Sequence, residues 1–138
     1  MSKKLALLLV PFTMLVLSDV APAQPQGAKG VKATVLTTLP VTGLPDKEMI
    51  MIAMEVAPGG GSGLHTHPGD EYGTVLEGTL MVKIGKADFR EVNAGQTFSA
   101  PEGTPMEVKN TGKQTARVIN VLINKKGAPR STPVHKDH

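Results

Sequence analysis

Hydrophobic residues in this chain fall in short runs, many of them rich in Val, Thr or Leu, with Gly, Pro or Asn between the runs. Such runs are typical of β-strands bounded by turns. Beyond the N-terminal segment, no window of eleven or more residues shows a helical stripe. The chain is therefore predicted to be all-β, with an antiparallel sandwich or jelly-roll barrel as the natural candidate. The expected strands are residues 31–39, 48–57, 72–77, 79–84, 87–92, 97–100, 106–110 and 116–124.

The N-terminal segment has a different pattern. Residues 1–4 are basic, and residues 5–17 form an uncharged, mostly apolar run. As a helix this run would be about 20 Å long, which is short of the ~30 Å hydrocarbon core of a bilayer. Small residues follow at Ala21 and Ala23. These features predict a secretory signal peptide over residues 1–23, cleaved between Ala23 and Gln24.

Cleavage would leave a single domain with a short segment at each end. Residues 24–30 are rich in Pro, Gly and Gln and are expected to form a flexible leader. Residues 31–126 are expected to form the β-barrel, and residues 127–138 a flexible tail. The sequence has no cysteine, which excludes disulfides and thiolate metal sites. Because no later segment has the apolar length of a membrane span, the mature protein is expected to be periplasmic or secreted.

The charge of the mature chain does not favour nucleic-acid binding. Loss of Lys3, Lys4 and Asp19 with the signal peptide lowers the formal net charge from +3 to +2. The remaining basic residues are dispersed, with no run longer than Lys125-Lys126, and aromatic residues for base stacking are scarce. We therefore expect no nucleic-acid partner.

The strongest chemical pattern lies in residues 59–78, which hold two of the four histidines. His65 and His67 stand two residues apart, so in an extended chain both project to the same face. The Pro-Gly-Asp sequence at residues 68–70 is typical of a turn, which would bring Glu71 back beside the imidazoles. Two histidines and one carboxylate on one face form a metal site that leaves coordination positions open.

This pattern resembles the first motif of the cupin superfamily, in which Gly, His, His, Glu and Gly follow one another at set spacings. The matching residues are Gly59, His65, His67, Glu71 and Gly78. The second cupin motif is matched in register at Gly95, Pro101, Gly103 and Asn110. At the position of its histidine, however, the chain has Met106.

The resemblance implies a small antiparallel β-barrel that holds a divalent metal inside and admits a small molecule at the barrel mouth. It also implies a homodimer. Cupins usually bind Fe, Mn, Ni, Cu or Zn through three histidines and the glutamate, so the Met106 position leaves three interpretations open. The metal is held by His65, His67 and Glu71 alone; Met106 adds a weak fourth ligand that favours copper; or the barrel is metal-free.

The tail adds a further alternative. His135 and His138 lie after Gly127 and Pro129, where a chain that folds back could supply the missing imidazole. The simpler interpretation is a solvated terminus.

An open metal site favours an enzyme that acts on a small molecule such as an enol, diol or carboxylate. The expected activity is that of a dioxygenase-like oxidoreductase or an isomerase, with Glu71 able to act as a base. The alternative is a non-catalytic module that binds a metal or small ligand in the same cavity, which the loss of the fourth ligand at Met106 would permit.

Overall fold

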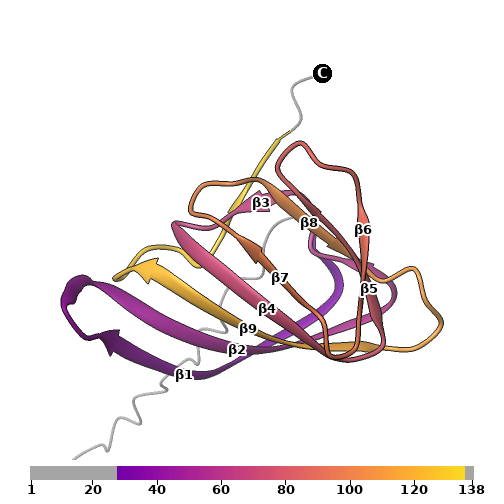
Figure 1. The fold of residues 1–138 in the computed structure, drawn as a ribbon, viewed down its shortest axis with the longest axis horizontal. Helices are drawn as coiled ribbons and strands as arrows, with labels where there is room; N and C mark the ends of the chain where they lie inside the picture. The colour runs from indigo at the N-terminus through magenta and orange to yellow at the C-terminus, as the bar shows by residue number, and fades with distance from the viewer. Residues whose placement is uncertain (1–27, 136–138) are drawn as a thin grey trace, which may run out of the picture.

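The computed structural model describes residues 28–135, and every regular element among them is a β-strand (Figure 1). This confirms the prediction of an all-β antiparallel jelly-roll barrel. No helix in this part of the chain has the length and hydropathy needed to cross a membrane. The predicted signal peptide and its cleavage site at Ala23 and Gln24 lie outside the described residues, as does His138.

The described chain contains ten strands. They are β1 (Lys29–Val41), β2 (Leu44–Gly61), β3 (His65–Thr66), β4 (Gly69–Glu77), β5 (Thr79–Ile84), β6 (Arg90–Asn93), β7 (Thr97–Ala100), β8 (Met106–Lys109), β9 (Ala116–Lys125) and β10 (Thr132–Pro133). Each predicted run overlaps one of them. The β1–β2 hairpin is longer than its sequence suggested, because Val41 pairs directly with Leu44 and the turn needs only two residues. Gly43, at a φ of 81°, makes that tight turn possible.

All the strand pairs are antiparallel, and the main path runs β10-β3-β8-β2-β9-β4-β7. Strand β1 pairs with β2, and β5 pairs with both β6 and β8. Strand β2 reaches two parts of the barrel, since its residues 47–56 pair with β9 whereas Gly61 pairs with Lys109 of β8. The strand turns through Gly60, where an added Cβ would lie 2.8 Å from the carbonyl oxygens of Ala57 and Lys29. Only glycine fits such an approach.

The core consists of two clusters of buried hydrophobic side chains inside the barrel. The larger cluster includes Val56, Val75, Leu80 and Val92, each with no exposed surface, and it also contains Met54 and Met106. The smaller cluster contains Ile50, Ile52 and Leu122. Full burial of a side chain of this kind contributes about 1.5–3 kcal/mol, so the clusters hold the strands that carry the polar residues described below.

The two ends of the domain differ from the sequence expectation. Strand β1 begins at Lys29, within the expected leader. The expected tail contains β10, which pairs with β3 through Thr132↔Thr66 and Pro133↔His65. The Val134 amide also donates to the Leu64 carbonyl at 3.0 Å. These hydrogen bonds occupy an edge of β3 that would otherwise expose unpaired backbone groups.

Asn110, from the second motif, is buried and bonds to the backbone at three points. Its Nδ2 atom donates to the Val56 carbonyl at 2.8 Å and to the Gln114 carbonyl at 2.7 Å. Its Oδ1 atom accepts from the Gly112 amide at 2.9 Å. The residue therefore has a structural role in joining β2 to the loop between β8 and β9.

Substituting Asn110→Ala should lower the free energy of unfolding by about 2–4 kcal/mol, because it leaves buried backbone groups without partners. Urea unfolding followed by circular dichroism measures this change. The control is Asn93→Ala, which removes exposed hydrogen bonds to Thr79 and Glu91 and should cost less than about 1 kcal/mol. Equal losses in the two variants would contradict the structural role of Asn110.

Candidate functional site

The two histidines and the glutamate of the first motif come together inside the barrel mouth. His65 lies on β3, His67 directly after it, and Glu71 on β4. All three side chains are largely buried: His65 and Glu71 are 5% and 3% exposed, and the His67 side chain is 10% exposed. The period of two along the extended chain and the bend at Pro68 produce this arrangement, as their spacing indicates.

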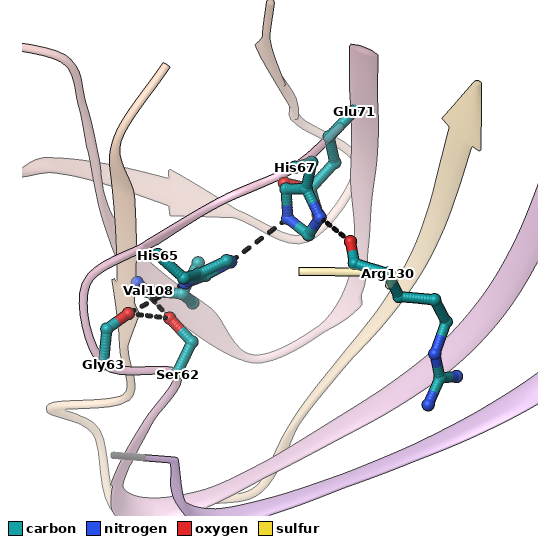
Figure 2. Close-up of polar contacts among 7 residues, drawn as sticks. All are labelled: Ser62, Gly63, His65, His67, Glu71, Val108 and Arg130. Atoms are coloured by element: carbon teal, nitrogen blue, oxygen red, sulfur yellow. Dashed lines mark hydrogen bonds and ion pairs between the residues drawn. The ribbon is translucent and has the colours of Figure 1, made fainter. Parts of the chain in front are cut away.

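The ring nitrogens of the histidines face each other, as Figure 2 shows. His65 Nε2 lies 3.1 Å from His67 Nε2, and the two rings are nearly perpendicular, with an interplanar angle of 89°. His67 Nε2 also lies 3.3 Å from Glu71 Oε2. His67 is therefore the middle member of the group and contacts both of the others.

Backbone carbonyls fix the outer nitrogen of each imidazole. His65 Nδ1 donates to the Gly63 carbonyl at 2.9 Å, and His67 Nδ1 donates to the Arg130 carbonyl at 2.5 Å. Because a carbonyl oxygen can only accept, each Nδ1 carries the proton. In the neutral form of either ring, the lone pair is then on Nε2, the atom that faces the interior of the group. Histidines that bind metals are commonly oriented by such a hydrogen bond.

The two imidazoles differ in proton affinity. Burial lowers the pKa of His65 below its ordinary value of 6.5, against the opposing effect of the Gly63 carbonyl. Burial also acts to lower the pKa of His67, but the close contact with the Glu71 carboxylate at 3.3 Å and its negative charge outweigh it, so the pKa of His67 is raised. A proton on the Nε2 side of the pair is therefore held more strongly by His67 than by His65.

Glu71 has a buried oxygen that is not satisfied by the protein. Although Glu71 Oε2 lies within ion-pair distance of His67, it has no hydrogen-bond partner among residues 28–135. A buried carboxylate oxygen in this state is costly unless another group binds it. Two imidazole nitrogens and this oxygen are suitable ligands for a first-row divalent metal.

The three side chains are not already grouped around one point. Within residues 28–135, no set of three His, Asp or Glu side chains is arranged ready to hold an ion. Met106 occupies the ladder position opposite His65, is 1% exposed and lines the same cavity as the histidines and Glu71.

The site opens into a cavity of about 780 Å³. Its floor is formed by residues from both core clusters, namely Ile52, Met54, Met106, Val108 and Leu122. One wall comes from residues 128–133 of the C-terminal segment, and Ala28, Val31 and Ala33 also line the cavity. His135 lies at the exposed margin of the same cavity. The cavity is thus mostly apolar, with the histidines and Glu71 on one side.

The remaining motif positions support the frame and do not line the cavity. Gly59, Gly78, Gly95 and Gly103 all have positive φ angles, between 71° and 84°. Pro101 is exposed at the start of the turn that leads to Met106. These residues shape turns that an L-amino acid with a side chain would strain.

Three polar contributors to the site are absent from the sequence prediction. They are the Gly63 carbonyl, Asn120 of β9 and Arg130. Asn120 could have been found from the alternation of β9, in which it shares a face with the apolar residues Val118 and Leu122. No local sequence pattern pointed to Arg130, because its carbonyl bonds to a histidine that lies 63 residues away along the chain, His67.

Comparison with protein families matches a cupin domain to residues 52–122, about half of the chain. The chain is 35% identical over 79 residues to the HTH-type transcriptional regulator PuuR of Escherichia coli (strain K12), covering 56% of this chain and 42% of the regulator. It is 29% identical over 108 residues to germin-like protein subfamily T member 3 of Arabidopsis thaliana, covering 75% of this chain and 48% of the relative. The chain spans less than half the length of either relative.

Solved structures include a similar oxalate oxidase in complex with the substrate analogue glycolate. Identity is 30% and the TM-score 0.58, over 74% of this chain and 54% of the oxidase. The polyketide cyclase RemF from Streptomyces resistomycificus is 24% identical with a TM-score of 0.62, over 83% of this chain and 78% of the cyclase, and shows a shared fold alone. The matched domain, the two motifs and the barrel agree, and the chain belongs to the cupin family.

Proposed function

We propose that His65, His67 and Glu71 bind a divalent metal, and that the protein is an enzyme that acts on a small molecule in the adjoining cavity. The single observation that carries the proposal is the pair of Nε2 atoms, which face each other at 3.1 Å while both Nδ1 atoms donate to carbonyls. Two nitrogens bound to one ion at about 2.1 Å can be no more than about 4.2 Å apart. The observed separation satisfies that limit.

The third ligand is Glu71, whose buried Oε2 atom lacks a hydrogen-bond partner among the described residues. In the structure His67 lies between His65 and Glu71. Binding by all three therefore requires a side-chain adjustment, since no three ligands are preset around one point within residues 28–135. It also releases the proton from His67, because imidazole binds metal in its neutral form.

The metal would act as a Lewis acid toward an oxygen of the bound molecule, and a redox-active ion would extend this to oxidation. Glu71 is the residue placed to hold or move a proton, because it is the one carboxylate among the residues that line the cavity. The apolar floor excludes water from the same space. An oxidoreductase of the dioxygenase-like type or an isomerase would use these features, and the 30% identity to an oxalate oxidase supports testing oxidation of small acids first.

A specific observation also supports the non-catalytic alternative. Met106 stands opposite His65 in the strand ladder, where its weakly binding thioether takes the place of a histidine. A binding module would tolerate that change more readily than an enzyme. The two functions share the metal site and differ in whether a bound small molecule is converted.

Replacing His65→Ala should lower metal affinity at least about a hundredfold, since loss of even an outer-shell partner costs 10–100-fold. Glu71→Gln should lower it as well, because the amide removes the anionic ligand. Metal content is measured by inductively coupled plasma mass spectrometry after reconstitution with Fe, Mn, Ni, Cu or Zn.

The matched control is Asp70→Asn, a neighbouring carboxylate that accepts a hydrogen bond from the Glu102 amide at 2.9 Å outside the cavity. It should retain full metal content. Metal bound equally by wild type and His65→Ala, or absent from wild type after every reconstitution, would overturn the proposed site.

Met106→His should increase metal affinity by about tenfold or more, because the new imidazole would add a ligand beside His65. Competition with a chelator of known affinity measures the change. Tighter binding together with new or faster turnover of a small acid supports the enzyme, whereas tighter binding without turnover supports the binding module. Unchanged affinity would show that residue 106 does not reach the metal.

Export and dimer formation stay predictions from the sequence. Residues 1–23, which carry the predicted signal peptide, lie outside the described part of the chain. The edge strand β1 exposes Val35, Leu36 and Leu39, which suits the homodimer that the cupin resemblance implies.

A further inference from the structure

The cavity contains polar atoms that the proposed metal site does not use. Three buried side-chain atoms of residues that line it have no hydrogen-bond partner among residues 28–135: Glu71 Oε2, Asn120 Oδ1 and Arg130 Nη1. The first is assigned to the metal. The other two lie in a space whose remaining walls are largely apolar, where unsatisfied polar groups are costly.

We infer that Arg130 binds a carboxylate group of the small molecule that occupies the cavity, and so determines its charge class. This inference rests on the proposed function in taking the cavity as the ligand site, and it adds the kind of ligand. Arginine is the residue suited to the task, because its planar guanidinium can donate two parallel hydrogen bonds to one carboxylate.

The charges around the cavity support an anionic ligand. Among residues 28–135, Arg130 is the one lining residue with a permanent positive charge. No carboxylate among residues 28–135 forms an ion pair with it. Glu71, the one acidic lining residue in the described part of the chain, lies instead beside His67. The charge of Arg130 is therefore available to a ligand.

The main chain holds Arg130 in place independently of its side chain. Its carbonyl accepts the hydrogen bond from His67 Nδ1, and β10 begins two residues later and pairs with β3. Figure 2 shows that this carbonyl faces His67, while the guanidinium extends away from both imidazoles. A carboxylate bound by Arg130 would thus lie apart from the proposed metal, and the ligand would extend from one to the other.

Other lining residues indicate what the rest of the ligand contains. Ile52, Met54 and Leu122 offer apolar contact, and the Asn120 Oδ1 atom, which has no partner among residues 28–135, is free to accept a hydrogen bond from the ligand. The ligand class is therefore a small carboxylic acid with an apolar portion and a hydrogen-bond donor, such as a hydroxyl group.

The experiment compares acids with their uncharged amides in protein stripped of metal with EDTA. The probes are oxalate, glycolate, benzoate and hexanoate, each paired with its amide, and dissociation constants come from ligand-observed NMR. We expect at least one acid to bind about tenfold more tightly than its amide, as a charged hydrogen bond allows. A wild-type protein that prefers no acid over its amide overturns the inference.

Variants of Arg130 test whether its side chain causes the preference for acids over amides. Arg130→Gln should abolish it without weakening amide binding, whereas Arg130→Lys should restore part of it, because lysine keeps the charge and loses the paired geometry. Arg90→Gln is the control, since Arg90 is an exposed arginine outside the cavity that donates to the Thr97 carbonyl. A preference that survives in Arg130→Gln overturns the inference.

Metal content separates this inference from the metal proposal. Arg130→Gln keeps the backbone carbonyl that holds His67, so its metal content should equal that of wild type. His65→Ala should lose the metal and still prefer acids over amides. If wild type binds metal but prefers no acid over its amide, the carboxylate site is refuted and the metal site is not.

Discussion

The hydrogen bond from His67 Nδ1 to the Arg130 carbonyl is the contact on which the site depends. It fixes the proton on the outer nitrogen of the imidazole and turns Nε2 toward His65 and Glu71. The same contact fastens the C-terminal segment across the barrel mouth, with β10 and the Val134 amide completing its attachment to residues 64–66. One hydrogen bond thus orients a candidate ligand and closes a wall of the cavity.

Strand β2 is the second constraint, because it pairs with strands in two parts of the barrel, β9 and β8. Its regular pairing with β9 ends at Val56, and the glycines that follow let the backbone pass close to Lys29 and Ala57 before reaching β8. Asn110 stabilises this passage by its hydrogen bond to the Val56 carbonyl. The histidine strand therefore begins from a rigid position, although β3 itself has only two residues.

The features that could be predicted from the sequence are those set by local backbone geometry, such as strand alternation and turns. Alternation along an extended chain placed His65 and His67 on one face, and the turn before Met106 brought that residue opposite His65. What it could not predict depends on contacts between distant residues. The tail after Gly127 looks like a terminus by composition, yet its pairing with β3 makes Arg130 part of the cavity. Burial of a partnerless oxygen in Glu71 is likewise a property of packing.

The wall made by residues 128–133 lies beyond residues 52–122, to which the cupin domain matches. The candidate metal ligands thus lie within the matched stretch, and the arginine that we propose to bind the ligand lies outside it. Mutations in the second stretch can alter side chains at the mouth while leaving the strand pairing of the first unchanged. Ligand selectivity in such a protein can diverge through a few side chains of residues 128–133, while the strands that carry the histidines and Glu71 keep their pairing.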